Sequence, residues 1–346
     1  MTDPILSISE LVTEFSTPDG TVHAVDHVSY DVYPGETLGV VGESGSGKSV
    51  TVMSVLDLIP QPPGRIANGK ILFEGRNLLD LSAAEMRAVR GRDIGMIFQD
   101  PMTSLNPVFK VGHQIAEAMT VHQKLSDDVA RKRAIELLEL VGVPNAEDRY
   151  GRYPHEYSGG MRQRAMIAMA IANEPKLLIA DEPTTALDVT IQAQVLEILT
   201  KAKEETNAAT ILITHDLGLI AEMADRVVVM YGGRVVETGD VDTIFHEPRH
   251  PYTLGLISSL PRLDQDLERL VPISGQPPSL INLPPGCAFH PRCTLRQGRD
   301  RCVDERPDLL QVGPAHHSAC HFTDEMSKQV EDVEEQMGTA IEGDDR

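Results

Sequence analysis

The most constraining feature of the chain is a glycine-rich segment, GESGSGKS at residues 42–49, which fits the pattern G-x-x-x-x-G-K-[ST]. The apolar run TLGVV at residues 37–41 predicts a buried strand before it, and residues 50–58 predict a helix after it. In such a strand–loop–helix unit, backbone N–H groups and the helix dipole favour a bound triphosphate. The residues of the expected phosphate loop are Gly42, Glu43, Ser44, Gly45, Ser46, Gly47, Lys48 and Ser49. We expect Lys48 to reach the β- and γ-phosphates and Ser49 to bind Mg²⁺.

Composition favours a soluble globular protein, or one that meets a membrane only through partners. The 346 residues are 41% hydrophobic and carry a formal net charge of −21. Residues 323–346 contribute −7 through nine acidic and two basic residues, which predicts an acidic disordered tail. We expect no nucleic-acid partner for so acidic a chain. The first ten residues show no secretory signal, and residues 270–291, nearly uncharged, hold six prolines and predict no membrane helix.

Strands and helices alternate along most of the chain, which predicts an α/β fold with a mainly parallel core sheet. Residues 5–41 mix short apolar runs with turn signals and predict an antiparallel β layer. Residues 112–142 carry apolar side chains at helical spacing and predict an inserted helical subdomain. The expected divisions are a core domain over 1–250 with its helical subdomain at about 100–173, a small irregular domain over 251–322, and the tail over 323–346.

A second motif, LLIADE at residues 177–182, is an apolar run that ends in two carboxylates. A buried strand would deliver Asp181 to the sheet edge beside the phosphate loop, where it would hold Mg²⁺, through water. Glu182 would then lie next to the γ-phosphate and is the candidate base that polarises the attacking water. Taken alone, such a run also fits a strand followed by a solvated turn.

A third motif, YSGGM at residues 157–161, precedes a helical stretch. Ser158 can cap the helix, and Gly159 and Gly160 leave their N–H groups exposed, which predicts a second anion site at a helix N-terminus. One phosphate loop and one further phosphate-binding helix end suggest that two copies share a nucleotide. An ordinary capped helix is the alternative.

The order of these motifs resembles that in the ATP-binding subunit of ABC transporters, together with Gln99, the segment Ala186-Leu187-Asp188, and His215. The resemblance implies a P-loop NTPase core of the ABC ATPase type. It also implies that Gln99 senses Mg²⁺ and contacts membrane subunits, that Asp188 crosses a dimer interface, and that His215 meets the γ-phosphate. Residues 157–161 would cap the ATP of the opposite subunit, although the family's commonest signature, Leu-Ser-Gly-Gly-Gln, here has Tyr157 and Met161 at its ends. The adenine-stacking aromatic is not clear, and Phe15 lies near its expected place.

A narrower resemblance covers nearly the whole chain. Residues 98–107, FQDPMTSLNP, are similar to the corresponding loop of dipeptide and oligopeptide importers, and residues 250–253, residues 286–293 and Cys320-His321 match the C-terminal region of the same group. The resemblance implies an ATPase motor with a second ATP-binding subunit, as a heterodimer, two membrane permeases and an extracytoplasmic substrate-binding protein. It places the chain at the cytoplasmic face of the cell membrane. Dipeptides, oligopeptides and nickel all remain open as cargo.

The four cysteines, Cys287, Cys293, Cys302 and Cys320, all lie in the last fifth of the chain with spacing C-x5-C-x8-C-x17-C. Four thiolates can hold a 4Fe-4S cluster or one tetrahedral Zn²⁺, and unligated thiols are the third alternative. The arginines between them could offset the charge of a cluster; they are Arg292, Arg296, Arg299 and Arg301. The region also resembles an iron–sulfur module of some dipeptide-importer ATPases.

Two other functions compete with the importer motor. A non-transport ABC ATPase, such as a repair or translation factor, usually carries a coiled-coil insertion or tandem motor domains, and only 57 residues separate Gln99 from Tyr157. An iron–sulfur redox protein with a regulatory nucleotide site would not need the full hydrolysis set.

Overall fold

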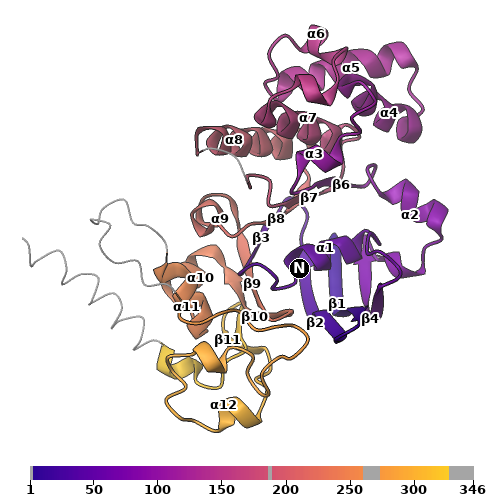
Figure 1. Cartoon of the computed structure of the whole chain (residues 1–346). Coiled ribbons are helices and arrows are strands. Elements are labelled where there is room, and N and C mark those ends of the chain that lie inside the picture. The colour runs from indigo at the N-terminus through magenta and orange to yellow at the C-terminus, as the bar shows by residue number, and fades with distance from the viewer. Residues whose placement is uncertain (1–2, 186–188, 260–272, 327–346) are drawn as a thin grey trace, which may run out of the picture.

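Two β-sheets organise the protein, whose computed structural model describes residues 3–185, 189–259 and 273–326 (Figure 1). The larger sheet has the strand order β11-β12-β10-β9-β3-β8-β7-β6, and the smaller has the order β2-β1-β4-β5. The strands of the larger sheet are β3 (Thr37–Val41), β6 (Ile94–Ile97), β7 (Leu177–Asp181), β8 (Ala209–Ile213), β9 (Arg226–Tyr231), β10 (Arg234–Asp240), β11 (Leu310–Gly313) and β12 (His316–Ser318). Those of the smaller are β1 (Leu6–Thr17), β2 (Gly20–Val32), β4 (Gly64–Phe73) and β5 (Arg76–Asn77).

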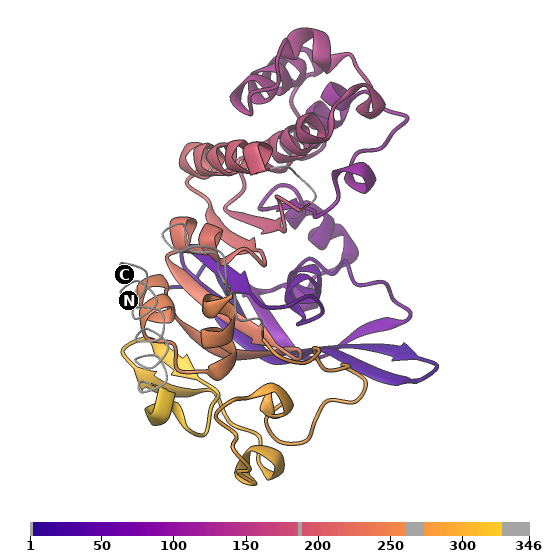
Figure 2. The ribbon, with the colours of Figure 1, turned by 60° about the vertical axis from the view of Figure 1, so that its left-hand side comes forward.

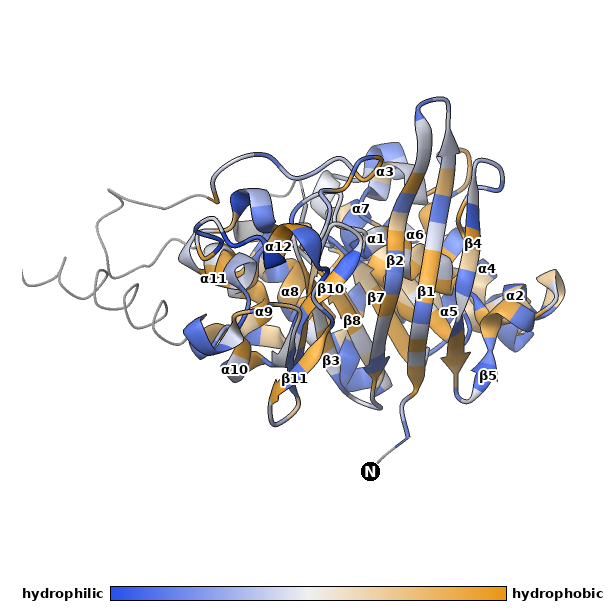
Figure 3. Ribbon diagram, turned by 90° about the horizontal axis from the view of Figure 1, so that it is seen from below, coloured by the Kyte–Doolittle hydropathy of each residue, from blue (hydrophilic) through white to orange (hydrophobic). Residues whose placement is uncertain are grey.

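The centre of the larger sheet is parallel, because β9, β3, β8, β7 and β6 pair in parallel register. Every residue of β3, β7 and β8 is buried, which explains why each reads as an unbroken apolar run. Figure 3 shows the contrast with the antiparallel layer, where hydrophobic and hydrophilic residues alternate along β1, β2 and β4. These strands confirm the predicted α/β core with an antiparallel β layer.

Helices cover the sheets and form a separate lobe. The helices are α1 (Lys48–Val55), α2 (Ala83–Val89), α3 (Pro101–Ser104), α4 (Val111–Gln123), α5 (Asp127–Leu140), α6 (Ala146–Tyr150), α7 (Gly159–Ile171), α8 (Val189–Thr206), α9 (Leu217–Met223), α10 (Val241–His246), α11 (Pro251–Ser258) and α12 (Arg301–Asp304). Short 3₁₀ turns lie at Leu78–Asp80 (η1), Pro154–Glu156 (η2) and His290–Arg292 (η3). Among the described residues, no helix combines the length and hydropathy that crossing a bilayer requires.

The lobe of α4, α5, α6 and α7 is the helical insertion that the sequence predicts (Figure 1). Ile115, Met119 and Leu138 are fully buried inside it, as their helical spacing indicates. In Figures 1 and 2 this lobe lies at one end of the molecule and the C-terminal region lies at the other.

The C-terminal region joins the main sheet, which the sequence pattern does not predict. Strand β12 pairs antiparallel with β10, and β11 pairs with β12. Glu237 of β10, which is fully buried, accepts hydrogen bonds from the backbone N–H of His250 at 3.0 Å and from Nε2 of His316 at 2.8 Å. Because buried carboxylates need such partners, this residue fastens α11 and β12 to the core. The described part of the tail, residues 323–326, is helical, and Met326 is buried.

Candidate functional site

The parallel strands bring four separated segments to one edge of the larger sheet. The phosphate loop follows β3 directly, and Glu182 follows β7 directly. Gln99 and His215 come two residues after the ends of β6 and β8. Since β3, β8, β7 and β6 are consecutive neighbours with the same direction, their carboxyl ends form one crevice, which is where open α/β sheets bind ligands.

The phosphate loop takes a shape that its glycines permit. Gly42 and Gly47 have φ of 149° and 102°, and a Cβ on Gly47 would meet the carbonyl oxygen of Ala24. Lys48 is buried, and its Nζ donates to the carbonyl oxygens of Gly42 at 2.7 Å and Glu43 at 3.0 Å. Burial lowers the pKa of the Lys48 ammonium, although Glu182, Asp181 and Glu43 oppose the shift. Because the Lys48 ammonium is held by carbonyl oxygens of the loop itself, it can exchange them for the oxygens of a phosphate.

Asp181 and Ser49 meet across the crevice. The hydroxyl of Ser49 donates to Oδ1 of Asp181 at 2.8 Å, and Asp181 is only 5% exposed. Burial raises the pKa of the Asp181 carboxyl, and the charge of Glu182 adds to this effect, while the Ser49 hydroxyl and Lys48 oppose it. One hydroxyl and one carboxylate at this spacing match the oxygen ligands that Mg²⁺ prefers, so the pair fits the expected metal.

Glu182 is the meeting point of three loops. Its Oε2 accepts hydrogen bonds from Nε2 of Gln99 at 2.9 Å and from the Thr185 hydroxyl at 2.8 Å, and it lies 3.7 Å from Nδ1 of His215. The backbone of Glu182 has φ 47°, and its N–H donates to the carbonyl of Ile213. The structure therefore unites Gln99, Glu182 and His215, as the resemblance to ABC ATPases implies. It adds Thr185, which sequence reasoning missed. Its position in a turn three residues after Glu182 is the feature from which the contact could have been predicted.

The third motif lies on the helical lobe. Ser158 caps α7, and its Oγ accepts the N–H of Met161 at 3.3 Å. Tyr157 is buried and donates to the carbonyl of Arg149 at 2.9 Å, so the departure from leucine anchors the segment. Ser158 and Gly159 remain exposed. Helix α7 packs on α3, α4, α5, α8 and β6, and among the described residues the hydrogen bonds of Tyr157 and Ser158 do not reach the phosphate loop of the same chain.

Two other expected nucleotide contacts differ in status. Phe15 is half-buried in β1 beside Gly64, where a Cβ on the glycine would lie 2.9 Å from the phenyl ring. Its role with adenine stays a prediction. Asp188 and its neighbours Ala186 and Leu187 lie outside the described residues.

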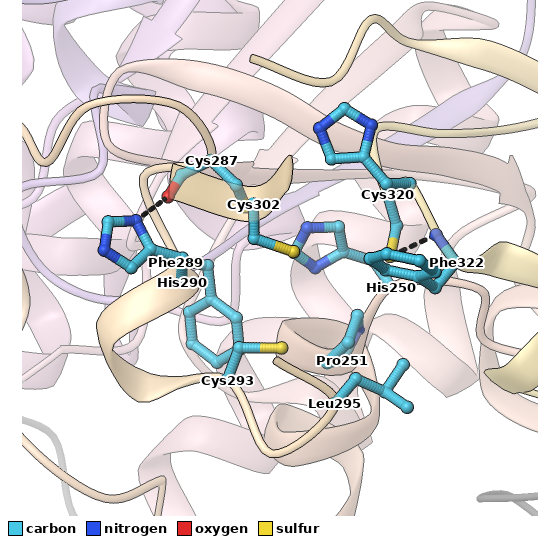
Figure 4. A pocket seen from close by; sticks show the side chains of 11 residues that line it. His250, Pro251, Cys287, Phe289, His290, Cys293, Leu295, Cys302, Cys320 and Phe322 are labelled. Atoms are coloured by element: carbon cyan, nitrogen blue, oxygen red, sulfur yellow. Dashed lines mark hydrogen bonds between the residues drawn. The ribbon is translucent and has the colours of Figure 1, made fainter. Parts of the chain in front are cut away.

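The four cysteines line one small cavity of about 10 Å³ in the C-terminal region (Figure 4). Figure 4 shows the sulfurs of Cys293, Cys302 and Cys320 directed toward the same space, with Phe289 and Phe322 beside it. Burial raises the pKa of the thiols, to about 11 for Cys287 and about 12 for Cys320, and the neighbouring thiols add to the shift. A bound cation would have to displace these protons.

Within the part of the chain that the structure describes, no three side chains of His, Cys, Asp or Glu are arranged to hold a single metal ion. This arrangement disfavours one tetrahedral Zn²⁺, whose ligands must crowd around one atom. The same finding gives a 4Fe-4S cluster no support either, and the structure shows only that the four cysteines line one cavity. The expected counter-charge is partly absent, because Arg292 is bound to Glu43 instead. Arg296, Arg299 and Arg301 do lie near Cys302 and lower its pKa against the effect of burial.

Comparison with known proteins agrees with this geometry. A family model described as "ABC transporter" matches residues 25–185, and one described as "Oligopeptide/dipeptide transporter, C-terminal region" matches residues 236–302. The chain is 54% identical over 314 residues to the oligopeptide transport ATP-binding protein OppD of Bacillus subtilis, covering 90% of this chain and 87% of that protein. It is 50% identical over 318 residues to the dipeptide transport ATP-binding protein DppD of Escherichia coli, covering 92% and 96%.

Among solved structures, the dimeric post-hydrolysis state of the ATP-binding cassette MJ0796, bound to ADP and Pi, has a TM-score of 0.62 at 25% identity and covers 68% of this chain and 98% of that one. The fold and the site thus define an ATP-binding protein of the ABC transporter class, and proteins of this class are ATPases. Within the class, the chain belongs to the family that carries the oligopeptide/dipeptide transporter C-terminal region. The resemblance that the sequence motifs indicate is confirmed.

Proposed function

We propose that this chain is the ATP-hydrolysing motor subunit of a peptide importer, with dipeptides or oligopeptides as cargo. The observation that carries the hydrolytic role is the convergence of Gln99, Thr185 and His215 on Glu182, next to the Ser49–Asp181 pair. The cargo is inferred from relatives named as oligopeptide and dipeptide transport proteins. Those names also favour transport over a repair or translation role.

In the proposed reaction, Lys48 leaves the loop carbonyls and binds the β- and γ-phosphates. Ser49 and Asp181, the latter through water, would hold Mg²⁺, which would supply neutralisation of phosphate charge. Glu182 accepts a proton from the attacking water at its carboxylate, while Gln99 orients that carboxylate. His215, on the next strand end, donates to the γ-phosphate oxygens and stabilises charge there.

The active assembly in this proposal is a pair of ATP-binding subunits. The exposed N-terminus of α7, with Ser158, Gly159 and Gly160, would complete the ATP held by the phosphate loop of the other subunit, and Asp188 would cross the interface. The placement of this motif on a lobe apart from the chain's own phosphate loop supports that role. Closure would require ATP, because the γ-phosphate supplies the joining contacts. We propose a heterodimer.

The proposed membrane partners are two permeases at the cytoplasmic face of the cell membrane, served by an extracytoplasmic substrate-binding protein. Support comes from residues 98–109, the segment around and after Gln99, which exposes several large apolar side chains. They are Phe98 (37% exposed), Met102 (61%), Val108 (71%) and Phe109 (57%). Such a patch beside the crevice suits a protein interface and would transmit the state of Gln99.

Substitution of the proposed base tests the hydrolytic role. Glu182→Gln keeps the shape of the side chain but removes its basicity, so ATP should still bind while turnover falls about 10²- to 10⁴-fold. Glu174→Gln is the matched control, because that carboxylate is exposed and pairs with Arg133 at the surface. Phosphate release by the reconstituted transporter is the measurement. Near-normal turnover of Glu182→Gln would remove this residue from the base role.

For the cysteine region we propose a 4Fe-4S cluster held by Cys287, Cys293, Cys302 and Cys320, with a structural role. Such a cluster would crosslink three segments of the C-terminal region. Anaerobic purification should yield about four irons per chain, and Cys302→Ala should reduce that content and lower the melting temperature. One zinc per chain without iron would show that the thiols hold Zn²⁺ instead of a cluster. The absence of both metals would show that the thiols are unligated.

We further propose an ATPase domain over residues 1–250, with its helical subdomain at about 100–173, a C-terminal domain over 251–322 that packs on it, and a tail over 323–346; the contacts of β12 with β10 and of Tyr252 with Glu43 support the packing.

A further inference from the structure

The C-terminal region contacts the phosphate loop at Glu43. Nη1 and Nη2 of Arg292 donate to the two carboxylate oxygens of Glu43 at 2.6 and 2.9 Å. The Arg292 side chain is only 5% exposed, and its Nε also donates to the carbonyl of Ser274 at 2.9 Å. Bidentate arginine–carboxylate pairs of this kind fix orientation as well as distance.

The backbone of the same loop residue is held independently. The N–H of Glu43 donates to the hydroxyl of Tyr252 at 2.7 Å. Tyr252, at the start of α11, is fully buried, and its ring centroid lies 4.6 Å from that of Tyr231 and 5.3 Å from that of Phe289. Because the rings immobilise the tyrosine, its hydroxyl is a fixed anchor for the loop.

These two anchors are continuous with the cysteine-lined cavity. Arg292 ends the turn η3 and directly precedes Cys293. Phe289 lines the cavity and also packs on Tyr231 and Tyr252. Any change in the position of the Cys287–Cys293 segment therefore reaches Glu43 through rigid, packed groups.

Glu43 in turn affects the residue that meets the phosphates. Its carbonyl oxygen accepts from Nζ of Lys48 at 3.0 Å, and it also accepts the N–H of Ser46 at 3.2 Å. A shift of Glu43 would alter both the resting place of the lysine and the turn of the loop.

We propose that Arg292 and Tyr252 are positioning residues for the phosphate loop, through which the C-terminal region sets the affinity for ATP. By linkage, bound ATP stabilises the C-terminal region by the same factor. The inference rests on the ATP site alone and not on the cargo or the identity of any metal. A failure to transport peptides would leave it standing.

The test measures the affinity of the purified full chain for MgATP by titration calorimetry. Arg292→Met, Glu43→Gln and Tyr252→Phe should each weaken binding about tenfold, the scale of coupling for residues in one network. The double variant of Glu43→Gln and Arg292→Met should bind about as weakly as each single one, because both remove one interaction. In steady-state assays of Arg292→Met and Tyr252→Phe, which lie outside the phosphate loop, KM for ATP should rise while kcat stays nearly constant, since Glu182 is untouched.

Arg306→Gln is the control, because Arg306 belongs to the same region but is exposed and faces Asp26 instead. It should bind ATP like the wild type. Tyr252→Phe removes one hydroxyl and keeps the buried ring, so it tests the anchor even if Arg292→Met does not fold. Wild-type affinity in both anchor variants would overturn the inference, as would equal weakening by Arg306→Gln or multiplicative losses in the double variant.

Discussion

The hydroxyl of Thr185 offers the sharpest test of how Glu182 is held. It donates to Oε2 of Glu182 at 2.8 Å, and the Glu182 side chain is 15% exposed. Hydrogen bonds to charged groups contribute about 1.5–3 kcal/mol. Since water can partly replace the hydroxyl at this exposure, the lower figure applies. At 1.36 kcal/mol per decade, Thr185→Val should lower kcat about tenfold.

The assay is phosphate release by the reconstituted transporter over a range of ATP concentrations. KM for ATP should stay near the wild-type value, because Lys48 and Ser49 keep their contacts. Thr185→Ser retains the hydroxyl and is the matched control, with expected turnover within about twofold of wild type. The reasoning is refuted if Thr185→Val turns over ATP normally, or if the serine variant is as slow as the valine variant.

Two further changes test the frame of the site. Gly47→Ala should weaken MgATP binding and lower stability by about 1–3 kcal/mol, because the φ of Gly47 is 102° and the added methyl would meet the carbonyl of Ala24. Calorimetry should show a smaller loss for Gly45→Ala, where φ is 78° but the space is open. Equal losses in the two variants would count against the steric argument. Asp26→Asn should lower the free energy of unfolding at pH 7 by about 1–3 kcal/mol. Burial tends to raise the pKa of Asp26, but hydrogen bonds from His27 and Arg234 outweigh it and leave the pKa below its ordinary value of 3.8. The wild-type contribution is present above that value and lost as the pH falls through the lower folded pKa, so urea unfolding of the variant should depend less on pH in this range, and an unchanged acid slope would contradict the assignment.

The sequence predicts those parts of the site that depend on local pattern and strand order. The runs before Gly42 and Asp181 are continuous and apolar because both faces of β3 and β7 are covered. Parallel strands with short connections then place the ends of β3, β6, β7 and β8 at one edge. This strand order explains why Gln99 and His215, which only the family resemblance placed at the site, meet Glu182 although they lie far apart in the chain.

The contacts that the sequence does not predict are those between segments whose residues show no helical or strand periodicity. Arg292 and Glu43 are 249 residues apart, and the cysteine spacing around Arg292 suggested a different role for it. The pairing of β12 with β10 is equally hidden, because a three-residue strand carries no alternation to read. Thr185 lies only three residues from Glu182, but a threonine after a carboxylate has many possible partners, so the sequence alone does not predict this contact.

The two attachments of Glu43 explain how a loop rich in glycine can be ready for its ligand. Gly42, Gly45 and Gly47 give the loop access to positive φ, and that freedom must be lost when a triphosphate binds. If Glu43 is already fixed by the C-terminal region, part of this entropy cost is met before ATP arrives, which raises affinity. Lys48, in contrast, is held by the carbonyl oxygens of Gly42 and Glu43 and, at 3.5 Å, by the hydroxyl of Ser46, all of which it can exchange for phosphate oxygens. The loop therefore combines one fixed residue, Glu43, with one exchangeable cation, Lys48. Of these two, Glu43 is the one that the C-terminal region contacts directly.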